Sequence, residues 1–427
     1  MPANKFNKDL QFYKFCSYGF LKNLRFFEPF LMLFFIEKGL SFLEIGILYS
    51  IREIGVNLIE IPTGIIADIF GRRKTMVFSF ACYIIAFLVF NFSTSFTVFI
   101  FAMICFSFGE AFRTGTHKAM IFEYLRIKGW TDQKVHYYGH TRSASQIGSA
   151  VSAVIAALIV YYTGTLKVVF LYSTIPYFLD LFLMMSYPKA LDGDLKGFSP
   201  AEIVESIRGV FVSFFKALKN PVFVKTIVNI SVPQGFHKAV KDYLQPAITM
   251  FALSIPLFMY LEDQKRVSIM IGLFYTVIYL LTSVASKNSG NIAERFRHLC
   301  LPLNITLFAV FIVGAVVGVF MKTGLPIVAI AGFLVIYVIE NIRRPIGVSY
   351  LSSMVDPQIV ATVLSIDSQF SAFAASVIAL VLGYIADKAG IGTAIIIISF
   401  VMGIFSIFAL LPGEKCKLEN LEEELNG

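Results

Sequence analysis

Apolar residues gather along the chain in long runs that short polar stretches separate. A helix needs about 20 residues to cross the hydrocarbon core of a bilayer. Windows of roughly that length fall into two successive sets, at 14–36, 44–66, 75–94, 97–119, 141–162 and 167–187, and then at 222–253, 267–286, 299–320, 325–346, 361–384 and 392–411. The pattern predicts an all-α membrane protein with twelve transmembrane helices in two successive sets of six.

The polar interval between the two sets divides the chain into parts. We expect a first bundle at 1–187, a cytoplasmic linker at 188–220, a second bundle at 221–412 and a cytoplasmic tail at 413–427. Between Pro200 and Leu218, apolar residues recur at helical intervals with charges between them, at Ile203, Ile207, Val210, Phe211, Phe214 and Leu218. This spacing predicts an amphipathic helix that lies on the membrane surface.

Composition supports a membrane protein and excludes a nucleic-acid partner. Hydrophobic residues make up 57% of the 427 residues and charged residues 15%, whereas a soluble domain carries about a quarter charged residues. The net charge of +8 comes from lysines and arginines dispersed between apolar runs, which indicates basic loops. The five cysteines are isolated and form neither a disulfide framework nor a zinc site.

The basic residues also predict the orientation. Twelve spans place both termini on one side, and the loops on that side hold most of the loop lysines and arginines. Because basic loops stay in the cytoplasm, we expect a multi-pass protein of the inner or plasma membrane with both termini cytoplasmic. We also expect it to be a monomer.

The stretch GIIADIFGRRK, from Gly64 to Lys74, lies between the second and third windows. Asp68 should occupy the last turn of one helix, and Gly71 the turn that follows. The stretch resembles the loop between helices two and three of the major facilitator superfamily, and the matching residues are Gly64, Ala67, Asp68, Gly71, Arg72, Arg73 and Lys74. The resemblance implies two six-helix bundles that move a substrate by alternating access. It also implies that the aspartate and arginine of the loop act as a gate that stabilises the outward-facing state.

Short matches between the halves predict an internal repeat. Glu110 and Arg113 recur as Glu340 and Arg343, and the Ser145-Gln146 pair recurs as residues 368–369. A parallel repeat of this kind is what the superfamily resemblance implies.

Polar and ionisable side chains within the predicted spans are the candidates for substrate binding or proton coupling. A charged group that faces lipid costs a few kcal/mol, so these side chains should turn inward. They are Arg25, Glu28, Arg52, Glu53, Asn57, Glu60, Glu110, Arg113, His117, Gln146, Asp180, His237, Lys238, Lys241, Glu340, Arg343 and Asp367.

Helical spacing groups several of these candidates in the first two spans. Arg25 and Glu28 lie three residues apart, so they can pair with each other or face a cavity. Glu53, Asn57 and Glu60 form one stripe, and Glu53 is the preferred proton carrier of that stripe.

Spans four and six carry further candidates. Glu110, Arg113 and His117 share a stripe in the fourth span. Arg113 resembles in position the functional arginine of the superfamily's proton-coupled exporters, although Gly115 departs from their glycine pattern. Asp180 is either a proton site or the partner of a neighbouring cation.

The seventh span is the least regular. Pro233 and Gly235 predict a helix that is interrupted in mid-membrane, where transporters expose groups to substrate. Alternatively, residues 238–242 reach the outer surface and the span ends early. The stretch from Gly383 to Gly390 copies the glycine and Ala-Asp spacing of the gate loop without its basic run, and is expected to be a helix-end turn.

These features predict a secondary active transporter rather than an enzyme. The sequence contains no GxxxxGK[ST] loop for ATP and no hydrolytic or metal constellation, so we expect no cofactor and no metal. An ion gradient, preferably of protons, should then drive transport. Because guanidinium groups bind carboxylates in a bidentate manner, the favoured substrate is a small anionic or zwitterionic solute, such as an organic acid, an amino-acid derivative or a carboxylate siderophore.

Two alternatives remain open. The 45 Phe and 19 Tyr allow a proton-driven multidrug exporter of lipophilic compounds, although the fifth window has only Gly148 and no proline where drug antiporters have a Gly-Pro-rich signature. A protein of another class, a receptor or scaffold that binds without transporting, would show ligand binding without gradient-dependent flux.

Overall fold

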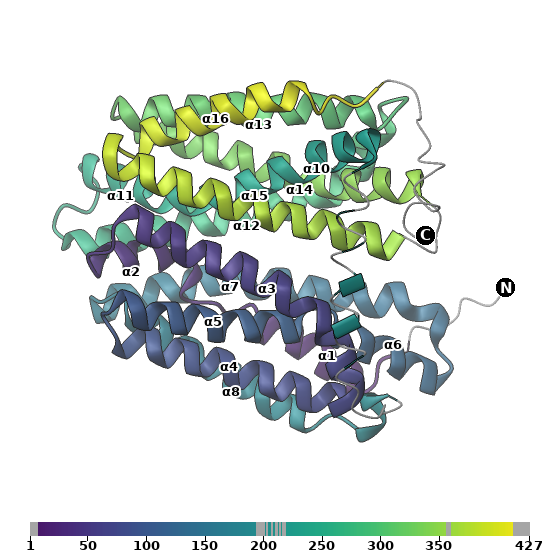
Figure 1. Cartoon of the computed structure of the whole chain (residues 1–427). Helices are drawn as coiled ribbons and strands as arrows, with labels where there is room; N and C mark the ends of the chain where they lie inside the picture. Colours follow the sequence, from purple (N-terminus) through teal and green to yellow (C-terminus); the bar gives the residue numbers. More distant parts are fainter. Residues whose placement is uncertain are drawn as a thin grey trace. The chain divides into compact units, whose positions relative to one another are not determined.

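The computed structural model describes residues 7–193, 219–355 and 360–412, together with positions 201, 204, 205, 208, 209, 212 and 215. All regular secondary structure in this part of the chain is helical (Figure 1). The apolar positions of the predicted surface helix, and the tail at 413–427, lie outside the described residues.

Contacts divide the chain into two compact units. Unit 1 comprises Met1–Phe30 and Leu58–Ser206, and unit 2 comprises Leu31–Asn57 and Ile207–Gly427. Residues 31–57 therefore group with the second half of the chain and not with the remainder of the first. Helix α3, Phe42–Phe70, begins in unit 2 and ends in unit 1.

Unit 1 is built on close helix pairs. Helix α4 packs against α5 and α8, and α1 packs against α7. At the α1–α7 contact, a Cβ added to Gly148 would overlap the carbonyl oxygen of Phe20, so the glycine lets the two backbones approach closely. The elements are α1 Leu10–Leu21, η1 Glu28–Phe30, α4 Arg72–Phe92, α5 Phe96–Arg113, α6 Thr116–Lys128, η2 Thr131–Gln133, α7 Lys134–Thr163, α8 Val168–Met185 and η3 Lys189–Asp192.

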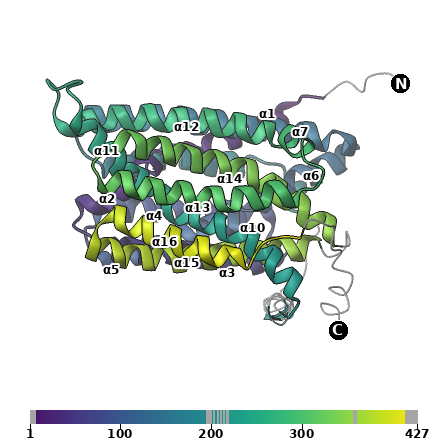
Figure 2. The same cartoon turned by 90° about the horizontal axis from the view of Figure 1, so that it is seen from above.

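Unit 2 follows a similar plan. Helix α13 packs against α14 and α16, α12 packs against α14, and α10 packs against α15 (Figure 2). The elements are α2 Leu31–Glu37, α10 Pro221–Val240, η4 Lys241–Tyr243, α11 Leu244–Ser254, α12 Asp263–Glu294, α13 Cys300–Lys322, α14 Pro326–Met354, α15 Val360–Ala389 and α16 Ile391–Ile407.

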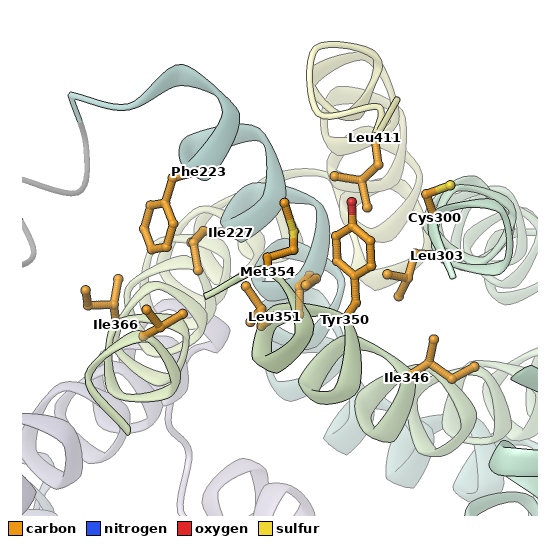
Figure 3. Close-up of a cluster of buried hydrophobic side chains, with 12 residues drawn as sticks. Phe223, Ile227, Cys300, Leu303, Ile346, Tyr350, Leu351, Met354, Ile366 and Leu411 are labelled. Atoms are coloured by element: carbon orange, nitrogen blue, oxygen red, sulfur yellow. The ribbon is translucent and has the colours of Figure 1, made fainter. Parts of the chain in front are cut away.

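A buried apolar cluster ties together one end of unit 2. Figure 3 shows side chains from α10, α13, α14 and α15 converging, with Tyr350 and Leu351 on α14 among them. Leu411, which follows α16, completes the cluster. Burial of this kind holds the helix ends together, so polar groups nearby are kept in fixed positions.

Every predicted window falls on described helices, and the all-α membrane fold is confirmed. Eight helical stretches in the described chain are long and apolar enough to cross a membrane, namely Arg72–Phe92, Phe96–Lys128, His136–Thr163, Val168–Met185, Asp263–Glu294, Cys300–Lys322, Pro326–Met354 and Thr362–Ala389. The windows at 44–66 and 392–411 correspond to α3 and α16, and the first and seventh windows correspond to broken helices.

The first window is not one continuous helix, so the prediction that Arg25 and Glu28 share a helix face is wrong. Helix α1 ends at Leu21, η1 begins at Glu28, and α2 starts only at Leu31. The interruption covers residues 22–27, and Pro29 lies after it, inside η1.

The seventh window is interrupted, but later than predicted. Helix α10 passes through Pro233 and Gly235 and ends at Val240. The break is the short η4, which starts at Lys241, and α11 then continues to Ser254. The packing of α10 explains this outcome: Gly235 lies so close to α15 that an added Cβ would be 2.7 Å from the Cβ of Ala374. The glycine therefore serves close helix packing and not a break.

Candidate functional site

The break after α1 brings two cations of unit 1 to the end of α5. Lys22 is the C-cap of α1, and Arg25 lies in the non-helical segment that follows. Glu110 and Arg113 occupy the last turn of α5. Charged groups therefore meet where one helix is interrupted and another ends, an arrangement that transporters use for substrate sites.

Glu110 is the centre of this group. Nη2 of Arg25 donates to Oε2 of Glu110 at 2.8 Å, and Nη2 of Arg113 donates to Oε1. The Tyr83 hydroxyl donates to Oε2, and Nε of Arg113 donates to the Tyr83 oxygen at 3.2 Å. One carboxylate thus accepts from two guanidinium groups and a phenol. We call Lys22, Arg25, Tyr83, Glu110 and Arg113 the Glu110 cluster.

Lys22 adds a third cation to the cluster. Its Nζ lies 5.4 Å from the centre of the Tyr18 ring, and its carbonyl accepts from the Tyr177 hydroxyl at 3.2 Å. Its electrostatic neighbours include Arg25, Arg113 and Glu110. Three basic side chains therefore lie near one carboxylate, and two of them form ion pairs with it.

Asp180 lies close to this excess of positive charge. It is on α8 with 0% of its surface exposed, and neither carboxyl oxygen has a hydrogen-bond partner among the described residues. Its cationic electrostatic neighbours are Lys22 and Arg113, yet neither forms an ion pair with it. The described side chains therefore provide neither a hydrogen bond nor an ion pair for Asp180.

His117 does not continue the Glu110 and Arg113 stripe, and that part of the prediction is wrong. Helix α5 ends at Arg113, Gly115 has a φ of +81°, and His117 belongs to the next helix, α6. The positive φ of Gly115 turns the chain between the two helices. His117 is instead stacked on Tyr18, with ring centres 3.6 Å apart, and its Nε2 lies 3.2 Å from the Tyr187 hydroxyl.

Unit 2 contains a second group of charges, on the first half of α3 and on α10. Nζ of Lys238 donates to Oε2 of Glu53 at 3.0 Å, and Nη2 of Arg52 donates to Oε1 at 3.3 Å. The Asn57 oxygen accepts from the Ser368 hydroxyl at 3.1 Å. The guanidinium of Arg52 also lies 5.0 Å from the centre of the Tyr49 ring. Glu53 is thus held between two cations.

Arg343 anchors helices to one another. It is 1% exposed on α14, and its guanidinium donates to the Leu303 carbonyl, the Thr306 hydroxyl, and both the backbone and side-chain oxygens of Asn229. These acceptors come from α13 and α10. Because the guanidinium is engaged by protein oxygens, we infer a structural role for Arg343.

The repeated Glu-x-x-Arg pattern therefore has different contacts in the two units. Glu110 binds Arg113 directly, whereas Glu340 is buried on α14 and no hydrogen bond links it to Arg343 among the described residues. Asp367 accepts from the Ser231 hydroxyl at 2.6 Å. Identical residues at repeated positions therefore make different contacts in the two units.

The other predicted residues are dispersed. His237 packs edge-on against Tyr337 with ring centres 4.7 Å apart, and Lys241 is the first residue of η4. Glu28 opens η1, and Glu60 is half-buried on α3 in unit 1. Gln146 is exposed on α7.

The gate loop has the predicted local geometry and a partner that the sequence did not indicate. Asp68 lies in the last turn of α3, Nη2 of Arg72 is 3.4 Å from its carboxylate, and Gly71 has a φ of +93°. Asp192 of η3 accepts from the backbone N–H of Arg73 at 2.8 Å and from its Nε at 3.2 Å. Gly64 is inside α3, and Lys74 is in the first turn of α4.

Some members of these sites could have been found from the sequence and others could not. Lys22 is an ionisable residue inside a predicted span, so the rule that selected Arg25 also applies to it. Tyr83 is one of 19 tyrosines, and nothing in its neighbourhood marks it as a partner of Glu110. Asn229 and Asp192 are likewise identified only by their contacts.

Among the described residues, no group of three or more histidine, cysteine, aspartate or glutamate side chains could hold a metal ion. The chemistry that the site offers is charge recognition and proton binding. Charged side chains buried within the helices of a membrane protein are typical of proteins that carry polar solutes or protons across the bilayer. The fold and the site thus define a membrane transport protein.

The chain belongs to the Major Facilitator Superfamily, whose model matches residues 14–366. It is 22% identical over 406 residues to the "Uncharacterized MFS-type transporter YxaM" of Bacillus subtilis (strain 168), with 93% of each chain covered. The chain is therefore a small-molecule transporter of the superfamily and not an enzyme.

Two solved structures show the same fold at low identity. A mutant of the nucleoside transporter NupG has a TM-score of 0.75 and 14% identity, covering 93% of this chain and 99% of that one. A POT family transporter in complex with 5-aminolevulinic acid has a TM-score of 0.72 and 14% identity, covering 96% and 97%. Similarity at this level concerns the fold alone.

Proposed function

We propose that the protein is a proton-coupled secondary transporter that moves a small anionic or zwitterionic solute by alternating access. The observation that carries this proposal is the Glu110 cluster, in which two guanidinium groups share a single carboxylate and a third basic side chain, Lys22, lies nearby. The superfamily membership supports transport, and the excess of positive charge supports an anionic group on the substrate.

The Glu110 cluster has the chemistry that a carboxylate ligand needs. Guanidinium groups present several N–H donors in one plane, and they bind carboxylates through paired hydrogen bonds. Arg25 and Arg113 share Glu110, and Nε of Arg25 is buried without a hydrogen-bond partner among the described residues. Glu110 neutralises only part of the positive charge of Arg25 and Arg113. A substrate carboxylate would neutralise the remainder.

Asp180 supports the coupling to protons. A carboxylate that is buried without a partner is costly as an anion, and a bound proton removes that cost. When Asp180 releases its proton, its negative charge faces Lys22 and Arg113 and competes with a substrate anion for them. When it holds a proton, the two cations are left to the substrate. Proton binding and anion binding then favour each other, which is the thermodynamic requirement of symport.

Glu53 is a weaker candidate for the coupling role than the sequence suggested. Its two carboxylate oxygens already contact Arg52 and Lys238. The charge of Glu53 is thus paired within the protein, whereas the Asp180 oxygens have no hydrogen-bond partner among the described residues. We therefore assign proton coupling to Asp180, and an ion-pair role to Glu53.

The multidrug alternative has one observation in its favour. The rings of Tyr83 and Tyr177 lie 5.0 Å apart beside the Glu110 cluster, and aromatic faces attract lipophilic cations. However, three cationic side chains at the same place would repel such a ligand, because like charges at short range in a low dielectric interact strongly. The balance of charge favours the anion.

The proposed orientation rests on the basic residues of the sequence, and the monomeric state is a separate proposal. Both termini face the cytoplasm, the membrane is the inner or plasma membrane, and the transporter works as a monomer. Basic loops on the side of the termini support this orientation.

Flux measurements in proteoliposomes test the proposal. With an imposed proton gradient, a panel of carboxylates, amino-acid zwitterions and lipophilic cations is offered to the wild type, Arg25→Gln and Asp180→Asn. Arg297→Gln, which alters an exposed arginine of unit 2, is the matched control. We expect gradient-driven flux of carboxylates or zwitterions that Arg25→Gln reduces by at least tenfold and that Arg297→Gln preserves.

Each alternative has its own result in this experiment. Flux restricted to lipophilic cations would replace the proposal with multidrug export. Saturable binding of a carboxylate without any gradient-dependent flux would identify a receptor. Melting temperatures of the variants show whether a loss of flux reflects unfolding.

A further inference from the structure

Lysine side chains lie over aromatic rings along α6 and the first two turns of α7. Nζ of Lys118 lies 5.5 Å from the centre of the Phe122 ring and 5.4 Å from that of Tyr138. Nζ of Lys134 lies 5.4 Å from the Phe122 ring. Phe122 therefore has two ammonium groups close to it. We call Lys118, Phe122, Lys134 and Tyr138 the Phe122 face.

A further lysine lies on an aromatic pair of the same segment. Nζ of Lys128 is 5.8 Å from the Tyr124 ring and 5.9 Å from the ring of Trp130, the single tryptophan of the chain. Cations and large aromatic rings thus occur together at this end of unit 1. That combination is typical of the boundary between lipid and water.

The lysines of this segment are not neutralised by the described side chains around them. Lys118, Lys128 and Lys134 are exposed, and their contacts among the described side chains are with aromatic rings. The carboxylate of Glu123 is already engaged by Arg126 at 2.6 Å. Positive charges held this near one another repel, so a bound anion would stabilise the arrangement.

The helix lengths place the Phe122 face at the level of the lipid headgroups. Helix α5 has 18 residues, which is about 27 Å of helix and close to the hydrocarbon core of about 30 Å. The chain then turns at Gly115, so α6 lies beyond the end of that span. Helix α7 has 30 residues, about 45 Å of helix, and ends at Thr163, so the length in excess of the core lies at the Lys134 end. Both ends of the face are therefore beyond the hydrocarbon core.

We propose that the Phe122 face is a binding site for the phosphate headgroup of an anionic phospholipid. The two lysines bind the phosphate as point charges. The rings of Phe122 and Tyr138 pack against the glycerol and the first carbons of the acyl chains, where aromatic side chains are favoured. A lysine near an anionic lipid surface strengthens binding by about fivefold, so the two lysines together contribute about 25-fold.

Lipid binding to the purified full-length chain tests this site. Native mass spectrometry from detergent measures the affinity for phosphatidylglycerol and for phosphatidylcholine. The double variant Lys118→Gln and Lys134→Gln is compared with Lys167→Gln and Lys322→Gln, which removes two exposed lysines elsewhere and changes the net charge equally. We expect the first pair to weaken phosphatidylglycerol binding by about 25-fold and the control pair by less than threefold.

Three results would overturn the proposal. Equal losses in the two double variants would mean that general surface charge attracts the lipid. Equal wild-type affinity for the two lipids would exclude headgroup recognition. Competition by inorganic phosphate at a concentration matching that of the lipid would identify a soluble phosphate as the ligand in place of a lipid. Thermal unfolding of each variant in detergent confirms that the compared proteins are folded.

Discussion

Replacement of Arg343 by glutamine is expected to destabilise unit 2. Its guanidinium makes four hydrogen bonds that join α14 to α10 and α13, and the side chain is 1% exposed. Glutamine is too short to reach the same set of acceptors. The oxygens of Leu303, Thr306 and Asn229 would then lose their donor in a buried place.

The size of the loss follows from these bonds. Hydrogen bonds between membrane helices contribute about 0.6 kcal/mol each on average, so four of them contribute about 2.5 kcal/mol. Acceptors left buried without a donor raise the cost to about 4 kcal/mol. For a unit of this size, 1 kcal/mol corresponds to about 2–4 °C, so the melting temperature should fall by about 5–15 °C.

Cys300 provides a reporter within the same unit. It is 5% exposed and belongs to the apolar cluster that contains Leu303 (Figure 3). With the other cysteines replaced by serine, a thiol-reactive fluorophore labels Cys300 on heating only when this part of unit 2 opens. The midpoint of labelling against temperature then gives the stability of the region.

Arg344→Gln is the matched control, because Arg344 is the exposed neighbour of Arg343 on the same helix. We expect its labelling midpoint to lie within about 2 °C of the parent's, since surface substitutions change stability little. Equal midpoints for Arg343→Gln and Arg344→Gln would refute the structural role. If transport were lost at an unchanged midpoint, Arg343 would instead be a substrate contact.

Three further substitutions test other parts of the structure. Asp180→Asn should uncouple transport from the proton gradient while preserving exchange of labelled substrate across the membrane, and loss of both activities would argue against a coupling role. Asp192→Ala removes the acceptor of the Arg73 backbone N–H at the start of α4, so it should lower the free energy of unfolding by about 1–2 kcal/mol and lower the melting temperature. An unchanged melting temperature would show that the contact does not contribute to stability. Asp387→Ala removes the acceptor of two backbone N–H groups at the start of α3 and should speed hydrogen exchange there, so unaltered exchange would count against it.

The apolar pattern was sufficient to predict the helices, but not where they break. Long apolar runs indicate helices because the bilayer provides no partner for an unpaired backbone group. The breaks depend on local details within such runs. The first window breaks at residues 22–27, before Pro29 is reached, and Gly115 turns the chain within the fourth span, whereas Pro233 is accommodated in a continuous α10. The presence of a proline or glycine in the sequence therefore does not show whether the helix breaks there, turns or continues.

The candidate charges were predictable, but their partners were not. The cost of exposing charge to lipid selected Arg25, Glu110 and Arg113 from the sequence alone. Helical spacing suggested Glu28 as a partner of Arg25, yet Arg25 binds Glu110, which lies 85 residues away. Tertiary contacts between distant segments decide such pairs, and one sequence contains no record of them.

The gate loop shows the same limit. Its turn and its charged residues were predicted correctly because they depend on a short, contiguous motif. Its contact with Asp192, more than a hundred residues further along the chain, depends on how α8 returns to α4. Local rules determine the shape of the loop, and packing determines its partner.

The sharing of Glu110 by two arginines affects how variation at these positions should be interpreted. If either Arg25 or Arg113 is lost, the other still neutralises the carboxylate, so folding stability is buffered against the first replacement and not against the second, whereas substrate flux depends on each arginine. Effects at groups that share a partner do not add. Single-site scans would therefore rank each arginine as less important than the pair is. In relatives that lack one of the two arginines, the other should be conserved more strictly. The residues at the two positions should therefore be correlated across the family.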